Sequence, residues 1–251
     1  MSIDGSREFN KVSRIYDKGR LSEDISFWAV EAEKFALLTP DSLVVDMGCG
    51  TGNYGLGIGE MTGATVIGFD PAPGMLKQAI EKNSDFQVVR AAAESMPFRS
   101  RVFDLVYAAQ VWHHIQGRQN AADECFRVLK FSGIKIAHTI GHSQLNEKTI
   151  FKIFQEIKEN QLRVYPSDDE FNTIFKKAGF KSVVLYPYLI ERYQTAEELI
   201  EIAEKKLWSM FRPITQQGLE KGVKWLRQWS SDNPGVDIRN DELITLFVAR
   251  K

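Results

Sequence analysis

Short apolar runs recur along the chain and predict a set of strands. The five runs in the first 140 residues are rich in β-branched and other apolar residues, and they cover 43–45, 65–69, 86–90, 103–108 and 134–140. Runs of this length that end at glycine or polar residues are typical of strands buried within a sheet. Two further strands are predicted at 182–192 and 243–249, the last as the antiparallel hairpin partner that closes the sheet.

Apolar residues at helical spacing predict amphipathic helices between and after these strands. The expected helices cover 4–16, 22–38, 73–82, 120–129, 147–161, 167–178, 195–211 and 218–230, and another begins after Gly55. Ser22 is the expected N-cap of its helix, because acidic residues follow it in the first turn. Gly179 is placed as the C-terminal stop of the helix that ends at Ala178.

The stretch 43–55 joins a strand to a glycine-rich loop. Its apolar run ends at Asp46, and Gly48, Gly50 and Gly52 follow on alternate positions. Glycines allow positive φ angles and let a ligand come close to the backbone. The helix that follows would point its free N–H groups at a ligand carboxylate or phosphate. The stretch therefore predicts a cofactor site.

Two classes of cofactor use such a turn. Gly50, Gly52 and Gly55 fit the G-x-G-x-x-G fingerprint of dinucleotide sites, and Asp70 follows at about the twenty-residue separation that this fingerprint expects. Asp46 favours the other class. A pyrophosphate gains nothing from a negative charge at that position, whereas a sulfonium cofactor with an α-amino group does.

These residues resemble the first motif of the class I S-adenosylmethionine (SAM)-dependent methyltransferases, an acidic residue followed by x-Gly-x-Gly-x-Gly. The resemblance is to the ubiquinone-biosynthesis-like, small-molecule branch (methyltransferase type 11) and is stronger over 43–133 than beyond. It implies an α/β fold, with a Rossmann-like, seven-stranded, mostly parallel sheet, helices on both faces and a helical lid. It also implies a single domain over 1–251, with its core at about 41–192 and 242–251 and its lid elements at about 1–38, 145–178 and 195–231.

The resemblance implies that SAM is the cofactor. A tyrosine-x-x-x-arginine segment, Tyr16 to Arg20, would fold over its methionine end, and Asp70 would accept both ribose hydroxyls. The residues expected to bind SAM are Tyr16, Arg20, Asp46, Gly48, Cys49, Gly50, Gly52, Asn53, Asp70, Pro71, Met75, Ala92, Ala93, Glu94, Gln110 and Val111. Four of them have a structural alternative: packing for Tyr16, a surface charge for Arg20, helix capping for Asp70 and core packing for Met75.

The segment 91–98 departs from the family pattern at one position. Ala92 stands where the family has an aspartate that hydrogen-bonds the adenine amino group. That side-chain contact is therefore absent, which leaves the backbone N–H of Ala93 to reach the ring.

The implied reaction is methyl transfer from SAM to a small-molecule acceptor by in-line displacement, for which alignment is the main demand. His113 and His114, which follow the fourth strand, are candidate general bases because neutral imidazole accepts a proton near pH 7. Both histidines could equally cap a turn or wall the pocket. The residues that could line an acceptor pocket are Trp112, His142, Tyr188, Trp208 and Phe211.

Composition and charge indicate which broad classes of protein fit this chain. The 251 residues are 43% hydrophobic and 26% charged, which suits a globular protein with a core. A net charge of −1 argues against nucleic-acid binding. The chain has no apolar run of about eighteen residues and no apolar signal core, so we expect a cytoplasmic protein that binds no membrane. Its two cysteines and four histidines predict neither a disulfide framework nor a metal site.

Other functions are open at this point. An NAD-dependent oxidoreductase would use Gly50, Gly52 and Gly55, and a non-catalytic SAM-binding protein would share every cofactor motif. Titration with SAM and with NAD distinguishes the oxidoreductase from a methyltransferase. Formation of S-adenosylhomocysteine with an acceptor distinguishes a methyltransferase from a non-catalytic SAM-binding protein. A nucleic-acid methyltransferase is disfavoured, because 109–112 reads Ala-Gln-Val-Trp where base-amino methyltransferases carry Asn-Pro-Pro-Tyr. These motifs specify neither the acceptor nor the oligomeric state.

Overall fold

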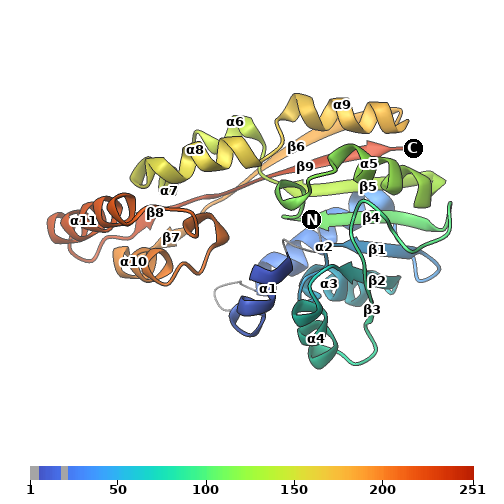
Figure 1. Ribbon diagram of the computed structural model, residues 1–251, viewed down its shortest axis with the longest axis horizontal. Coiled ribbons are helices and arrows are strands. Elements are labelled where there is room, and N and C mark those ends of the chain that lie inside the picture. Colours follow the sequence, from blue (N-terminus) through green and yellow to red (C-terminus); the bar gives the residue numbers. More distant parts are fainter. Residues whose placement is uncertain (1–5, 18–21) are drawn as a thin grey trace. The chain divides into compact units, whose positions relative to one another are not determined.

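The computed structural model describes residues 6–17 and 22–251 (Figure 1). The described helices, with short 3-10 helices written η, are α1 (Ser6–Val12), η1 (Ser13–Ile15), α2 (Ser22–Ala36), α3 (Asn53–Thr62), α4 (Pro73–Lys82), η2 (Trp112–His114), α5 (Arg118–Val128), α6 (His142–Leu145), α7 (Thr149–Ile153), α8 (Gln155–Val164), α9 (Asp168–Ala178), α10 (Ala196–Glu204), η3 (Ser209–Phe211) and α11 (Gln216–Asp232). The described strands are β1 (Leu43–Met47), β2 (Thr65–Asp70), β3 (Gln87–Arg90), β4 (Phe103–Ala109), β5 (Leu129–Thr139), β6 (Ser182–Ile190), β7 (Tyr193–Gln194), β8 (Ile238–Arg239) and β9 (Glu242–Arg250).

Seven strands form one sheet in the order β3-β2-β1-β4-β5-β9-β6. The strand β1 pairs in parallel with both β2 and β4, while β3 and β5 extend the parallel pairing outward. The predicted Rossmann-like, mostly parallel sheet is therefore confirmed. Because the chain leaves β1 for β2 on one side and later returns to β4 on the other, β1 and β4 form the switch point where open α/β sheets bind ligands.

The chain divides into two compact units. The first comprises Met1–Thr139, Asp169–Tyr186 and Leu246–Lys251, and the second comprises Ile140–Asp168 and Pro187–Thr245. Of the helices predicted as a lid, α1, α2 and α9 belong to the first unit, whereas α7, α8, α10 and α11 belong to the second. The prediction that all these parts work as a single domain stays a prediction.

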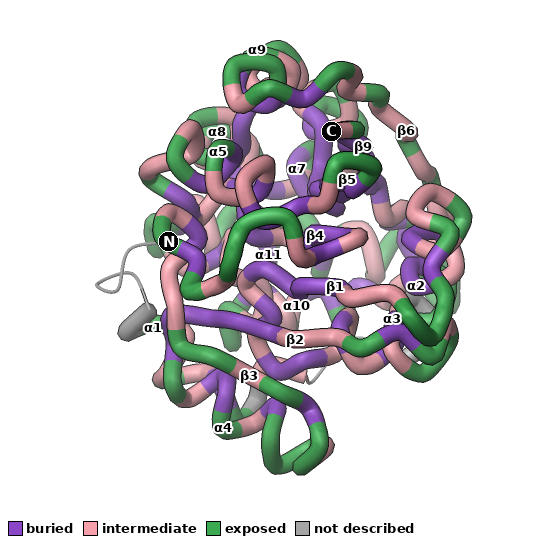
Figure 2. Tube along the Cα trace, turned by 90° about the vertical axis from the view of Figure 1, so that its right-hand side faces the viewer, coloured by how far each residue is buried: buried purple, intermediate pink, exposed green. Residues whose placement is uncertain are grey.

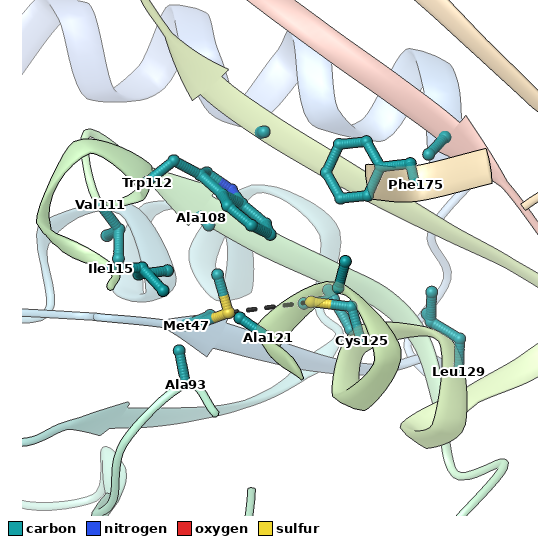
Figure 3. Packing of buried hydrophobic residues seen from close by; sticks show 14 of the residues in the cluster. Met47, Ala93, Ala108, Val111, Trp112, Ile115, Ala121, Cys125, Leu129 and Phe175 are labelled. Atoms are coloured by element: carbon teal, nitrogen blue, oxygen red, sulfur yellow. Dashed lines mark hydrogen bonds between the residues drawn. The ribbon is translucent and has the colours of Figure 1, made fainter. Parts of the chain in front are cut away.

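The core of the first unit covers one face of the sheet. Trp112 is fully buried there, with its ring centroid 5.2 Å from that of Phe175, while Met47 approaches Cys125 on α5 (Figure 3). Most of β1 and β4 is buried (Figure 2). Since side chains alternate along a strand, Met47 points to this core and the preceding residue, Asp46, points to the opposite face.

Two predicted helices are shorter than expected, which corrects the sequence prediction. The helix predicted at 147–161 is interrupted at Phe154, which has φ −114° and ψ 75° and separates α7 from α8. The ring of Phe154 instead packs edge-on against Phe211, with centroids 5.0 Å apart. The helix predicted at 195–211 ends at Glu204, since Lys206 takes a positive φ of 49°. Gly179, at φ +109°, follows α9 as predicted.

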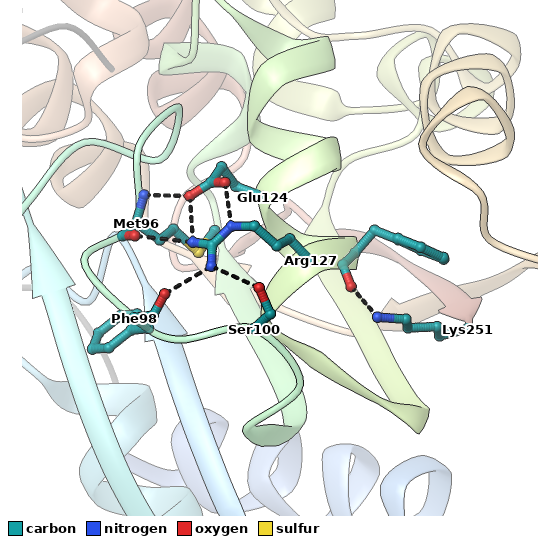
Figure 4. A network of polar contacts seen from close by, with 7 residues as sticks. Met96, Phe98, Ser100, Glu124, Arg127 and Lys251 are labelled. Atoms are coloured by element: carbon teal, nitrogen blue, oxygen red, sulfur yellow. Dashed lines mark hydrogen bonds and ion pairs between the residues drawn. The ribbon is translucent and has the colours of Figure 1, made fainter.

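An arginine on α5 holds the loop that follows β3 (Figure 4). The guanidinium of Arg127 donates to the carbonyls of Met96 at 3.1 Å and Phe98 at 2.8 Å, and to Ser100 Oγ at 3.3 Å. It also pairs with both carboxylate oxygens of Glu124, at 2.6 and 2.8 Å, and Glu124 accepts the backbone N–H of Met96 at 2.7 Å. This network fixes the position of the segment that includes Ala93.

Replacing Arg127 with alanine should therefore destabilise the fold. The change removes charge-assisted hydrogen bonds and leaves two loop carbonyls without their donor, so we expect a loss of about 2 kcal/mol in the free energy of unfolding. Urea unfolding measures the loss, and the control is Arg99→Ala, which changes an exposed arginine on the same loop. Equal stability of the two variants would contradict the role given to this network.

Candidate cofactor site

A cavity in the first unit lies at the carboxyl ends of β1, β2 and β4. Its empty space is about 520 Å³, open solvent included. Its lining residues come from the N-terminal segment, the glycine loop and the turns after β2, β3 and β4, and they are Phe9, Tyr16, Gly48, Gly50, Phe69, Asp70, Pro71, Met75, Ala93, Ala109, Gln110, Val111 and His114.

The glycine loop takes a shape that other residues would strain. Gly48, Gly50 and Gly52 have φ angles of +70°, +55° and +84°, in the region that favours glycine. A Cβ on Gly48 would also lie 2.6 Å from a methyl group of Val111. The N–H groups of Gly48 and Cys49 both donate to the carbonyl of Phe69, so the loop is held against the end of β2.

Asp70 is buried at the wall of the cavity with its carboxylate fixed by the backbone. Its Oδ2 accepts the N–H of Gly50 at 3.1 Å, and its Oδ1 accepts the N–H of Ala72 at 2.8 Å. Burial raises the pKa of Asp70 to about 6, although these two N–H groups lower it. The carboxylate is thus held in one orientation, and each of its oxygens can still accept a further hydrogen bond.

Asp46 lies behind the glycine loop and is only 2% exposed. Its Oδ2 has no hydrogen-bond partner among the described residues. Burial raises its pKa to about 7, against the lowering effects of the Gly55 N–H and the Lys135 charge, and the nearby Asp70 adds repulsion. In the ligand-free protein burial disfavours the ionised form of Asp46. A cation bound close to this carboxylate would favour that form.

The cavity brings together about half of the residues predicted to bind the cofactor. Those that line it are Tyr16, Gly48, Gly50, Asp70, Pro71, Met75, Ala93, Gln110 and Val111. The predicted residues that are not among its lining are Asp46, Cys49, Gly52, Asn53, Ala92 and Glu94. Arg20 lies outside the described residues. Phe9, Phe69 and Ala109 line the cavity without having been predicted, because a lone apolar residue in a strand or helix carries no signal of a ligand.

The two candidate bases have different surroundings. His114 lines the cavity, and its ring meets that of Phe9 edge-on with centroids 5.1 Å apart. His113 is not part of the lining, and burial lowers its pKa well below 6.5, aided by the adjacent His114. Of the pair, only His114 is therefore in a position to reach a molecule in the cavity.

The structure does not bring the residues predicted to bind the acceptor to this cavity. Trp112 is part of the core, between Phe171 and Phe175, because its large ring is buried more completely there. The other four residues, His142, Tyr188, Trp208 and Phe211, belong to the second unit.

Within that second unit, the rings of Trp208 and Phe211 lie together, with centroids 6.3 Å apart, and the other two residues have environments of their own. The Nε2 atom of His142 lies 2.8 Å from the carbonyl of Tyr165. Phe211 is fully buried, and Tyr188 lines an open hollow of this unit together with residues such as Arg239. Their role in acceptor binding stays a prediction.

Comparison with known proteins shows what the chain is similar to. A family model described as a methyltransferase domain matches residues 45–137. A demethylmenaquinone methyltransferase from Chlorobaculum tepidum is 27% identical over 209 residues, which are 73% of this chain and 86% of the relative.

Solved structures agree on the fold. A protein from Anabaena variabilis, described as a putative methyltransferase of an antibiotic biosynthesis pathway, superposes with a TM-score of 0.72 at 19% identity, over 86% of this chain and 95% of the other. The phosphoethanolamine N-methyltransferase 2 of Haemonchus contortus, solved with S-adenosylhomocysteine, gives a TM-score of 0.57 at 19% identity over 89% and 52%.

Residues 45–137 match a methyltransferase domain, as the motifs indicated, and the chain is a SAM-dependent methyltransferase that is similar to the ubiquinone-biosynthesis-like, small-molecule branch. It transfers a methyl group from SAM to a small-molecule acceptor. The oxidoreductase and non-catalytic alternatives are thereby set aside. Among the described residues, no helix is long and apolar enough to cross a membrane, and no three or more His, Cys, Asp or Glu side chains are grouped to hold a metal ion.

Because Asp46 is buried, we expect the stability of the ligand-free protein to depend on pH. Its folded-state pKa, about 7, lies above the ordinary 3.8, so the folded protein holds a proton that the unfolded chain has released. The free energy of unfolding should therefore fall as pH rises between these two values. Asp46→Asn removes this loss. We therefore expect the melting temperature of the ligand-free variant, minus that of the wild type, to be larger at pH 8 than at pH 5.

Thermal melts at the two pH values provide the measurement. Asp85→Asn, which changes an exposed carboxylate, is the matched control and should track the wild type at both. A difference between the Asp46→Asn variant and the wild type that does not vary with pH would mean that the carboxyl of Asp46 is not buried as described.

Proposed function

We propose that the cavity at the β1–β4 switch point is the SAM site and that the acceptor is a quinol or a related hydroxylated aromatic ring. One observation carries the proposal for SAM: a glycine loop with positive φ angles and a backbone-oriented carboxylate, Asp70, line the same cavity. When bound, SAM supplies a methyl group that its positive sulfur already activates for in-line displacement.

Asp70 is the proposed partner of the ribose. Its two oxygens are held by the N–H groups of Gly50 and Ala72 and can each accept one ribose hydroxyl. The apolar side chains of Phe69, Met75 and Ala93 would contact the adenine ring on the same side of the cavity.

Asp46 is the proposed electrostatic partner of the cationic end of SAM. It need not touch the ligand, because a charge pair several ångströms apart in a buried setting is worth more than in water. Gly48 and Gly50 let the amino-acid tail approach the backbone, and Tyr16 would cover it. Gln110 and Val111 would then lie beside the methyl group.

His114 is the proposed general base. As an acceptor atom bonds to the methyl carbon, the electron pair of the breaking bond goes to sulfur, and the acceptor loses a proton that His114 can take. Alignment of the two molecules by the cavity walls would supply roughly 7 to 11 kcal/mol of the rate enhancement. His113, buried and neutral, would support the ring of His114, whose centroid lies 3.9 Å away.

Likeness to a demethylmenaquinone methyltransferase supports the acceptor class. A hydroxylated ring also suits the aromatic and apolar walls that Phe9, Phe69 and Val111 give the cavity, and its hydroxyl proton gives the base a function. We keep as predictions the acceptor roles of the second-unit residues, the lid, the absence of nucleic-acid and membrane partners, and the cytoplasmic location.

Asp70→Asn should weaken SAM binding. The substitution keeps one acceptor oxygen but removes the charge and the second acceptor. The loss corresponds to about one charge-assisted hydrogen bond, worth about 1.5–3 kcal/mol, so we expect the Kd to rise about 10- to 100-fold. Calorimetric titration with SAM, with NAD as a parallel ligand, measures it, and Asp85→Asn serves as the control. An unchanged Kd for the Asp70 variant would remove this residue from the site.

His114→Ala should lower kcat with a short-chain demethylmenaquinol by about 10²- to 10⁴-fold, the usual range for loss of a general base. The Kd for SAM should stay near that of the wild type. Release of labelled methyl product gives the rate. If His114→Ala retains the full rate, alignment alone is the mechanism, and if only an amine acceptor is methylated, the quinol assignment is wrong.

A further inference from the structure

Two rings of the cavity wall come from the short N-terminal segment 6–17. Tyr16 lies over the glycine loop, since a Cβ on Gly50 would be 4.0 Å from its Cε1 atom. Phe9 lies edge-on to His114. The segment contains only α1 and η1 and no strand of the sheet, so other contacts must hold these rings in place.

The residue after Tyr16 makes the most extensive of these contacts. Asp17 Oδ1 accepts a hydrogen bond from Thr51 Oγ1 at 2.7 Å and another from Asn53 Nδ2 at 2.9 Å. Its Oδ2 pairs with Lys82 Nζ at 2.9 Å, and the same ammonium contacts Asn53 Oδ1. Burial raises the pKa of Asp17, but Lys82, Thr51 and Asn53 together lower it below 3.8. The carboxylate is therefore ionised over the working pH range.

These partners belong to the glycine loop and to the ends of the two helices next to it. Thr51 and Asn53 flank Gly52, the N-cap of α3, and Lys82 is the last residue of α4. The α3 N-cap has no side-chain hydrogen bond, and a negative charge near a helix N-terminus is favourable. Asp17 thus links the N-terminal segment to the glycine loop through three side chains.

A second contact, made by Asn10 of α1, joins the segment to α4. Asn10 Oδ1 accepts the N–H of Gly74 in the first turn of α4 at 2.7 Å, where the N-cap Ala72 offers no side-chain acceptor. A Cβ on Gly74 would lie 2.8 Å from this oxygen. Asn10 of α1 thus contacts α4, and Asp17 contacts the glycine loop. Each of them is next in sequence to one of the two rings, Phe9 and Tyr16, so both rings have a neighbouring polar contact that holds them at the cavity.

We propose that Asp17 is a positioning residue for the methyl donor: its carboxylate fastens the segment 6–17 to the glycine loop, holds Tyr16 over Gly50 and so retains SAM and its product in the cavity. This inference rests on the proposed SAM site. Asp17 is not among the residues that line the cavity, so it acts through Tyr16 and should influence ligand retention without altering the chemical step.

The direct test is the dissociation rate of S-adenosylhomocysteine, measured by displacement with excess SAM. In Asp17→Ala all three contacts are lost, and we expect dissociation about 10- to 100-fold faster than in the wild type. Asp17→Asn keeps one oxygen for Thr51 but loses the charge. Lys82→Ala loses the ion pair with Asp17 and the contact with Asn53 but keeps both hydrogen bonds to Asp17 Oδ1. Dissociation from both variants should therefore be faster than from the wild type and slower than from Asp17→Ala. Lys77→Ala, which removes an exposed lysine of α4 that pairs with Glu81, is the matched control and should equal the wild type.

Two further measurements separate positioning from a general loss of structure. The KM for SAM should rise in Asp17→Ala in parallel with the dissociation rate, while the single-turnover rate at saturating SAM stays within about twofold of the wild type. Added salt should accelerate dissociation from the wild type and leave Asp17→Ala unaffected, because the pair with Lys82 is partly exposed and is screened.

The outcomes distinguish the positioning role of Asp17 from the proposed SAM site on which it rests. If the wild type binds S-adenosylhomocysteine and Asp17→Ala releases it at the same rate, the positioning role is overturned. A single-turnover rate that falls as far as retention does would also overturn it. If the wild type binds no S-adenosylhomocysteine, the proposed SAM site itself fails. Should Asp17→Ala not fold, Asp17→Asn and Lys82→Ala decide on the same criteria.

Discussion

The parallel pairing of β1 with β2 on one side and β4 on the other is the constraint on which the rest of the structure depends. Its register sets Asp46 opposite Gly68 and Tyr107. Because the three strands run in the same direction, their carboxyl ends reach the same edge of the sheet. The glycine loop, Asp70 and the turn that carries His114 therefore surround one cavity, although they are far apart in the sequence.

The same arrangement buries two carboxylates close together. Asp46 and Asp70 both have raised pKa values, of about 7 and 6, chiefly because burial disfavours the charged form. Among the described residues no salt bridge neutralises either carboxylate, so keeping either one ionised in the ligand-free site costs stability. Buried groups that cost stability are expected where a protein binds a ligand. Two buried carboxylates favour a ligand that carries positive charge.

Around this fixed region, the other walls of the cavity depend on polar contacts from neighbouring elements. Arg127 and Glu124 hold the loop that presents Ala93, and Asp17 and Asn10 hold the segment that presents Phe9 and Tyr16. Each contact is made by side chains outside the cavity lining. The site is thus built from a rigid sheet edge and from loops that are positioned by residues with no contact to the ligand space.

The sequence by itself determined the local units: the strand, glycine loop and helix at 43–62, the acidic end of β2 and the class of enzyme. These follow from residues adjacent in the chain, whose spacing and backbone preferences are visible without a fold. Only the tertiary structure decided that Trp112 belongs to the core, that Phe154 interrupts a helix by packing on Phe211, and that Asp17 meets Lys82. Such contacts join residues that are distant in the chain, and a pattern of polar and apolar positions holds no information on which distant side chain will be the partner.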